Sequence, residues 1–347
     1  MSDNVDTTQA PRKIGPPRTR ISRLLESRQL GWIALAVALL APFVTATPYA
    51  LNVMTTAAIF VMLASGLNIV VGYCGLLDLG YIAFMAVGAY TAGIVSRSFE
   101  LPLIFTIPVV LVMTVLAGLI IGVPTLRLRS DYLAIVTLGF GEITRITANN
   151  LTITGGPSGI FGIPGLLKIG DFDVQEPAVL YYVTALVVAV FVLASARLGK
   201  SRLGRAWRFV REDEDAAEAM GIHTYRVKLL AYIFGAVWGG LGGVLFAAHL
   251  SAVSPRSFIF LQSALVLMAV VMGGMGNMRG VVIGALVISL APELLREMAA
   301  HRYLAFGLLL VVVMVFRPQG FWPARGYERD LATVDADDAA VARGERR

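Results

Sequence analysis

The chain contains ten apolar stretches that are candidates for α-helices crossing a lipid bilayer, although several are short or interrupted by glycine. The third, eighth and ninth are alternatively broken or re-entrant helices. About 20 residues, rising about 1.5 Å each, span a hydrocarbon core of about 30 Å. Charged residues make up only 15% of the chain and apolar residues 57%. So little charge cannot cover a water-exposed surface, and we therefore predict an all-α polytopic membrane protein. The predicted spans are residues 30–47, 49–71, 77–96, 101–123, 131–149, 177–196, 229–250, 258–273, 280–296 and 302–316.

The positions of the basic residues predict how these spans are oriented. If both termini are cytoplasmic, 23 of the 29 Lys and Arg residues lie in cytoplasmic segments. Lys and Arg concentrate in the cytoplasmic loops of membrane proteins, so this distribution favours ten spans with cytoplasmic N and C termini. The same rule accounts for the net charge of +6, and we expect no nucleic acid partner.

A polar segment at residues 150–176 divides the chain into two halves. Five predicted spans precede it and five follow it, so the halves have opposite orientations, as in the inverted repeats of transporters. We expect two transmembrane halves, 30–149 and 177–316, joined by a periplasmic loop and flanked by cytoplasmic tails at 1–29 and 317–347. The end of the second tail is expected to be disordered. A cleaved signal peptide is the alternative for the first tail.

Residues of the types that support catalysis, nucleotide binding or metal binding do not form a familiar motif. Gly199-Lys200-Ser201 resembles the end of a phosphate-binding loop, but Ala194 stands where that loop needs a glycine. The 3 histidines are widely separated, and the single cysteine, Cys74, excludes an intrachain disulfide. We therefore expect no catalytic residue, no metal site and no cofactor bound by this chain.

Ionisable side chains inside the spans are costly, which makes them candidates for a translocation path or gate. Glu142 and Arg145 lie three residues apart on one helix face, where they can form an ion pair. A buried pair that only stabilises the helix bundle is the alternative. Asp78, followed by Tyr81, lies at the start of the third predicted span, where it could equally serve as an N-cap.

The predicted cytoplasmic loop 197–228 contains a candidate contact helix. Acidic residues suit its first turn, and a glycine suits its C-terminal cap. A helix over 212–220 would be about 13 Å long, the size of a knob on the surface of a partner. A solvated connecting helix is the alternative. The candidate contact residues are Glu212, Asp213, Asp215, Ala217, Met220 and Gly221.

The predicted periplasmic loop begins with a segment rich in glycine and proline. Gly155, Gly156, Pro157 and Gly159 lie within a few residues of one another. Such a segment is typical of a connector with several tight turns. A lid on which a periplasmic partner docks is the functional alternative.

Four of these segments together resemble the LivM-type permeases of the branched-chain amino acid ABC importers. They are GYCGLLDLGYIAFMAVGAY at 72–90, LGFGEITR at 138–145, TGGPSGIFGIP at 154–164 and the cytoplasmic segment 205–221. The ending at 316–321 is similar as well, and the resemblance extends from about residue 30 to 325.

The resemblance implies a function and a set of partners. The chain would be one of two unlike permease subunits in a bacterial inner membrane, the other being of the LivH type. Two separate ABC subunits would bind ATP-Mg and hydrolyse ATP, so this chain would not itself be an enzyme. A periplasmic binding protein would deliver a branched-chain amino acid. Segment 212–221 would be the coupling helix that contacts the ATPase, and loop 154–164 would face the binding protein.

Other functions remain open from the sequence. Related permeases import urea, amides or aromatic acids, and a homodimer could replace the heterodimer. An ion-coupled secondary transporter would use Glu142 or Asp78 to bind a proton or a sodium ion. A neighbouring Arg145 argues against a titrating Glu142, because an opposite charge stabilises the ionised carboxylate. An intramembrane enzyme lacks a set of catalytic residues.

Overall fold

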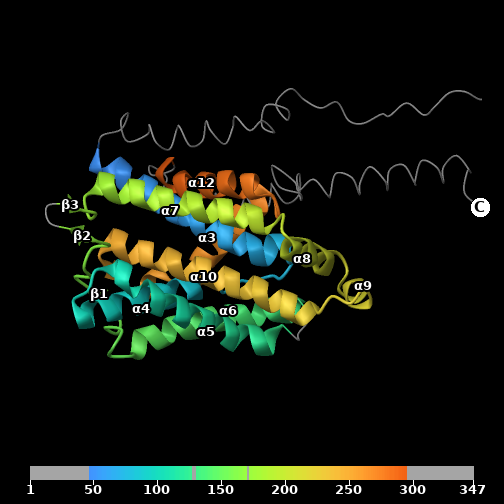
Figure 1. Cartoon of the computed structure of the whole chain (residues 1–347). Coiled ribbons are helices and arrows are strands. Elements are labelled where there is room, and N and C mark those ends of the chain that lie inside the picture. Colours follow the sequence, from blue (N-terminus) through green and yellow to red (C-terminus); the bar gives the residue numbers. More distant parts are fainter. Residues whose placement is uncertain (1–46, 127–129, 170–171, 295–347) are drawn as a thin grey trace, which may run out of the picture. The chain divides into compact units, whose positions relative to one another are not determined.

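Long helices run side by side in the computed structural model, which describes residues 47–126, 130–169 and 172–294 (Figure 1). Residues 30–46 of the first predicted span, the whole predicted span 302–316 and both tails lie outside these residues. The long helices are α3 (Pro48–Leu67), α4 (Ile82–Phe99), α5 (Ile107–Thr125), α6 (Ser130–Asn150), α7 (Pro177–Leu198), α10 (Thr224–Leu250), α11 (Phe260–Gly273) and α12 (Met278–Leu294).

Within the described ranges, 6 helical segments are long and apolar enough to cross a membrane. Helix α12 is apolar but shorter, and α6 is more polar. Each of these eight helices overlaps one predicted span, which confirms the all-α polytopic fold. The six segments are Pro48–Tyr73, Ile82–Phe99, Leu103–Thr125, Pro177–Leu198, Thr224–Leu250 and Pro255–Gly273.

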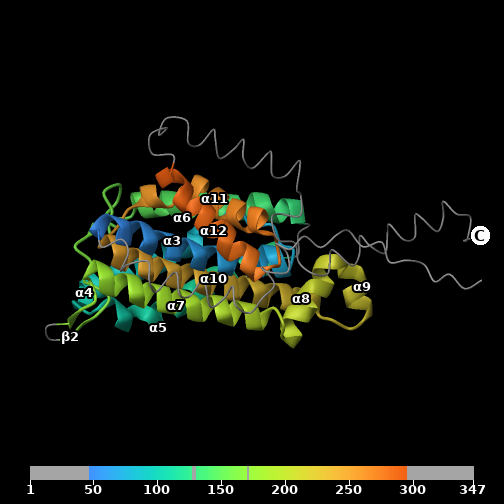
Figure 2. The ribbon, with the colours of Figure 1, turned by 90° about the horizontal axis from the view of Figure 1, so that it is seen from above.

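The two ends of the helix bundle carry different short elements (Figures 1 and 2). Helices α8 (Arg202–Glu212) and α9 (Glu214–Ala219) lie at one end, which we call the α8 end. The opposite end, which we call the strand end, carries two antiparallel strand pairs. The pairs are β1 (Ile160–Phe161) with β4 (Ala252–Val253), and β2 (Lys168–Ile169) with β3 (Phe172–Asp173).

Glycines allow the central helices to approach closely. Helix α10 packs against α3, α4 and α5. A Cβ atom on Gly88 of α4 would lie 2.1 Å from the carbonyl oxygen of Gly240 in α10, and one on Gly243 would lie 2.2 Å from that of Met85. Helices in lipid associate through such close packing, because lipid removes most of the hydrophobic driving force between them.

The connection between α3 and α4 differs from the prediction. Helix α3 continues as a π-helix, Asn68–Tyr73, and α4 begins only at Ile82, so the predicted span 77–96 starts too early. Gly75 has a φ of 75°, which ends the helical path. The Asp78 carboxylate then accepts a hydrogen bond from the Gly80 amide at 2.9 Å, which competes with helix formation at this point.

Candidate functional site

Helix α8 is anchored to the bundle by its apolar face. Ser201 caps it by accepting a hydrogen bond from the Gly204 amide at 3.2 Å. Trp207 is fully buried, its indole donates to the Val227 carbonyl at 2.8 Å, and its ring stacks on that of Tyr73 with centroids 6.5 Å apart. The short helices α8 and α9 therefore rest on α10, and α8 also rests on the π-helix that follows α3.

The predicted single helix over 212–220 is wrong in one respect, because the structure breaks it at Asp213. This residue ends α8 and begins α9, with a φ of −156°. Its carboxylate accepts a hydrogen bond from the Ala216 amide at 2.9 Å, so it acts as an N-cap and not as a mid-helix residue. The helical segments on both sides also extend further, and the loop predicted at 197–228 shortens to 199–223.

Helix α9 and the residues that flank it present most of the predicted contact residues to the outside. Glu212, Asp213 and Asp215 are exposed, Met220 is 74% exposed, and Ala217 alone is buried against the molecule. Gly221 has a φ of 83° and terminates the segment, as predicted. Glu212, Asp213, Asp215 and Met220 form a patch at the α8 end, which we call the exposed patch.

Side chains outside the predicted set hold this patch in place. Lys228 of α10 forms an ion pair with Glu214, and the Thr224 hydroxyl donates to the Glu218 carboxylate at 2.6 Å. Neither contact could be inferred from the sequence motif, because their α10 partners follow the loop. The only sequence signal for these two contacts is that acidic residues come shortly before the first basic and hydroxyl residues of the next helix.

The segment before α4 is a joint at which several helices meet. The Tyr81 hydroxyl donates to the Gly235 carbonyl of α10 at 2.9 Å, and the Leu79 amide donates to the Thr137 hydroxyl of α6 at 3.1 Å. Tyr81 is fully buried and Asp78 is 1% exposed. The alternative that Asp78 is the N-cap of α4 at the interface is wrong. The N-cap position belongs to Tyr81, and the Asp78 carboxylate closes a turn inside the bundle.

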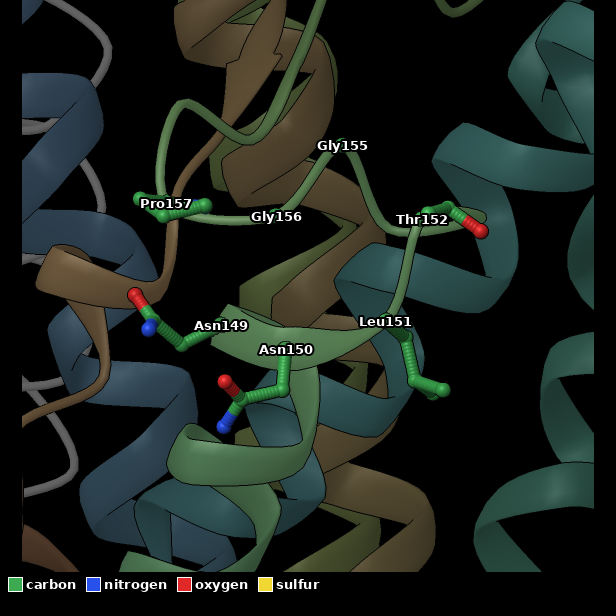
Figure 3. A pocket seen from close by; sticks show the side chains of 7 residues that line it. All are labelled: Asn149, Asn150, Leu151, Thr152, Gly155, Gly156 and Pro157. Carbon is green, nitrogen blue, oxygen red and sulfur yellow. The ribbon is translucent and has the colours of Figure 1, made fainter.

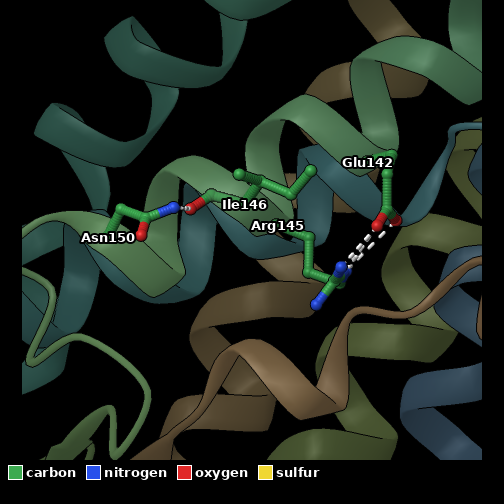
Figure 4. Close-up of polar contacts among 4 residues, drawn as sticks. All are labelled: Glu142, Arg145, Ile146 and Asn150. Atoms are coloured by element: carbon green, nitrogen blue, oxygen red, sulfur yellow. Dashed lines mark hydrogen bonds and ion pairs between the residues drawn. The ribbon is translucent and has the colours of Figure 1, made fainter.

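Glu142 and Arg145 form the predicted ion pair on α6 (Figure 4). The Arg145 Nε atom donates to the two Glu142 carboxylate oxygens at 3.0 and 3.1 Å. The pair is not buried within this chain, since the Glu142 side chain is 42% exposed and that of Arg145 is 29% exposed. Both residues lie in the middle of α6, where contact of a charge with lipid is costly.

The pair gives a testable prediction. Changing Glu142 or Arg145 singly to Ala should each lower the free energy of unfolding by about 1 kcal/mol, since one charge loses its partner. The double change should cost less than the sum of the two losses. Thermal unfolding of the four chains in detergent measures the coupling, with Thr147→Ala on the same helix as the control. Fully additive losses would show that the two groups do not interact.

The glycine-rich segment forms a shaped loop at the strand end. Gly155, Gly156 and Gly159 have φ values of 79°, 59° and 84°. A Cβ atom on Gly159 would lie 2.2 Å from the carbonyl oxygen of Val253, so this glycine allows the loop to touch the β4 strand. The loop also borders an open pocket of about 470 Å³ (Figure 3). Its lining residues are Asn149, Asn150, Leu151, Thr152, Gly155, Gly156 and Pro157.

Comparisons with known proteins identify the family. Residues 49–316 match the family described as the permease component of the branched-chain amino acid transport system. The chain belongs to this family. It is 41% identical over 295 residues to the high-affinity branched-chain amino acid transport system permease protein LivM of Escherichia coli, covering 78% of this chain and 69% of that protein. LivM of Salmonella typhimurium is 39% identical over 312 residues, which are 83% of this chain and 73% of that protein.

A second kind of permease is also related to this chain. The LivH protein of Salmonella typhimurium is 24% identical over 286 residues, covering 76% of this chain and 91% of that protein. No solved structure matches the chain significantly. Family membership and the 6 apolar helices found among the described residues identify this chain as a multi-pass protein of the inner membrane.

In the part of the chain that the structure describes, no cluster of His, Cys, Asp and Glu has the geometry of a metal site. Three regions contain the candidate functional residues. They are the exposed patch on α9, the charged face of α6 with the joint before α4, and the loop at the strand end.

Proposed function

We propose that this chain is one permease subunit of an ATP-driven importer for branched-chain amino acids. The observation that carries the proposal is the family match across residues 49–316, in which 41% identity to a LivM protein covers 78% of the chain. The relation to LivH supports a second, unlike permease as its partner. In this proposal ATP-Mg binds to two separate ABC subunits, this chain catalyses no reaction and binds no cofactor, and a periplasmic binding protein delivers the substrate.

The α8 end is the proposed cytoplasmic face. Basic residues concentrate in the segment that carries α8 and α9, and such segments are cytoplasmic in most membrane proteins. The exposed patch of Glu212, Asp213, Asp215 and Met220 then forms the coupling surface for one ATPase. Ala217 packs inward and Gly221 turns the chain toward α10, so both set the shape of that surface.

The strand end is then the periplasmic face. The loop with Gly155, Gly156, Pro157 and Gly159 is the proposed contact for the binding protein. Its contacts with β4 support this assignment, because the paired strands give the loop a defined shape before a partner arrives.

The charged face of α6 is the proposed border of the translocation path. Glu142 and Arg145 are partly exposed at the middle of α6, where a water-filled path or the second permease would spare them contact with lipid. Asp78 and Tyr81 are fully enclosed, so we assign them to the gate that joins α4 to α6 and α10 and not to the wall of the path.

The complete arrangement that we propose has ten spans, cytoplasmic termini and two inverted halves, 30–149 and 177–316. The packing of the helices supports the inverted repeat, because α3 and α10 have equivalent neighbours in the two halves. Helix α10 packs on α4 and α5, and α3 packs on α11 and α12. Under this exchange the helix pair α4 and α5 corresponds to α11 and α12.

Uptake of radioactive leucine tests the proposal. The chain is reconstituted in liposomes with its partner subunits and the binding protein, with ATP inside. The expected result is leucine accumulation that stops without ATP and is reduced by unlabelled isoleucine or valine. Inhibition by urea, an amide or an aromatic acid alone would identify a different substrate. Uptake driven by an ion gradient without ATP would contradict the proposal.

A further inference from the structure

Arg211, near the end of α8, reaches out of the cytoplasmic segment to the end of α3. Its guanidinium donates a hydrogen bond to the carbonyl of Gly72, which lies in the π-helix that follows α3. The residue is exposed as a whole, yet partial burial of the guanidinium lowers the pKa of Arg211, while the neighbouring Glu212 raises it. An arginine remains charged under such a shift, so the contact is a charge-assisted hydrogen bond.

Gly75 makes room for this contact. A Cβ atom at Gly75 would lie 2.7 Å from the Cγ atom of Arg211, so any other residue would collide with the arginine stem. Gly75 also has a φ of 75°, and its amide donates to the Val71 carbonyl at 3.2 Å. The arginine therefore touches the π-helix and the turn that ends it.

The other side of the same π-helix is attached to a distant turn. The side-chain oxygen of Asn68 accepts a hydrogen bond from the Gly276 amide at 2.9 Å. Gly276 lies between α11 and α12 and has a φ of 84°. A Cβ atom on Gly72 would lie 1.9 Å from the Asn68 side-chain oxygen and 2.6 Å from the Gly276 nitrogen, so the three groups are in close contact.

These contacts form a continuous physical route from α8 to the α11–α12 turn. A π-helix forms hydrogen bonds from residue i to i+5, one residue further than in an α-helix, and often occurs at functional sites. A one-residue shift rotates the following side chains by about 100°. A pull on the Gly72 carbonyl can therefore move the segment that leads into Asp78 and α4.

We propose that Arg211 is a positioning residue that transmits movement of α8 and α9 to the π-helix of α3 and from there to the α11–α12 turn. The inference rests on the proposed function, because the movement comes from the ATPase that contacts α9. Arg211 belongs to this route and is not one of the residues that form the exposed patch.

The test compares the ratio of leucine taken up to ATP hydrolysed in the reconstituted importer. Arg211→Met keeps the apolar stem beside Gly75 and removes the donor to Gly72, so the ratio should fall about tenfold while ATP hydrolysis stays within about twofold. Arg211→Lys restores a donor and should recover most of the ratio. Arg205→Met is the matched control, because the Arg205 guanidinium on the same helix bonds the nearby Lys200 carbonyl at 3.2 Å and not the π-helix.

The outcomes separate this inference from the proposed function. A wild-type complex without ATP-dependent uptake would contradict the function itself. A wild-type ratio in Arg211→Met, or an equal loss in Arg205→Met, would overturn the role of Arg211. If Arg211→Met does not join the complex, hydrogen exchange on the isolated chain decides. Faster exchange of the amides of Gly75 and Gly276 than in Arg205→Met supports the route, and unchanged exchange overturns it.

Discussion

A chain carrying Gly88→Ala is expected to lose the native packing of α4 on α10. The new Cβ atom would lie 2.1 Å from the Gly240 carbonyl oxygen and 2.5 Å from its Cα atom, which no real packing allows. Both atoms belong to a helix backbone, so relief requires the two helices to separate. Such overpacking should cost about 3 kcal/mol or more. Thermal unfolding in detergent and the yield of monodisperse protein measure the loss.

Gly139→Ala is the matched control for that change. Gly139 also lies in a helix, α6, but a Cβ atom there meets nothing within 4 Å. Because alanine favours a helix over glycine by about 1 kcal/mol, this change should leave stability unchanged or raise it. Equal losses at the two positions would show that helix propensity and not the close approach determines the effect.

Gly221→Pro is expected to abolish uptake while the chain still inserts into the membrane. The Gly221 amide donates to the Glu218 carbonyl at 2.9 Å, and its φ is 83°. Proline has no amide hydrogen and fixes φ near −65°, so neither feature can persist. The chain between α9 and α10 must then follow another path, which displaces the exposed patch from its ATPase. Uptake by reconstituted complexes and the amount of inserted chain measure the two effects.

Gly221→Ala separates the loss of the amide donor from the strain of a side chain at a positive φ. A Cβ atom there meets nothing within 4 Å, so alanine adds only the strain of a positive φ, about 1 to 2 kcal/mol. Most of the uptake should remain in this variant. Wild-type uptake by the Gly221→Pro chain would show that α9 is not part of the coupling surface.

The long helices could be predicted from the sequence because an apolar run of about 20 residues in lipid has few alternatives to a helix. The positions at which helices break or change type are harder to predict. Asp213 interrupts a segment of good helix formers through one side-chain hydrogen bond. The π-helix Asn68–Tyr73 has no distinct composition, and its first residue bonds to Gly276, which lies 208 positions further along the chain.

The candidate site residues divide in the same way. Glu142 and Arg145 pair because residues three apart on a helix are neighbours, which the sequence alone predicts. Their partial exposure depends on the packing of α6, which the sequence does not reveal. The burial of Asp78 was missed because its partners, the turn at Gly80 and the neighbouring helices, become visible only in the fold.

The most direct test of the account is to purify the tagged chain in mild detergent and to identify the proteins that co-purify. The account predicts a second, unlike permease and two ABC ATP-binding subunits in a fixed ratio with this chain. A monomer or homodimer that transports its substrate under an ion gradient, without ATP and without ATP-binding subunits, would contradict it. Such a result would direct attention to Glu142 and Asp78 as sites of ion coupling.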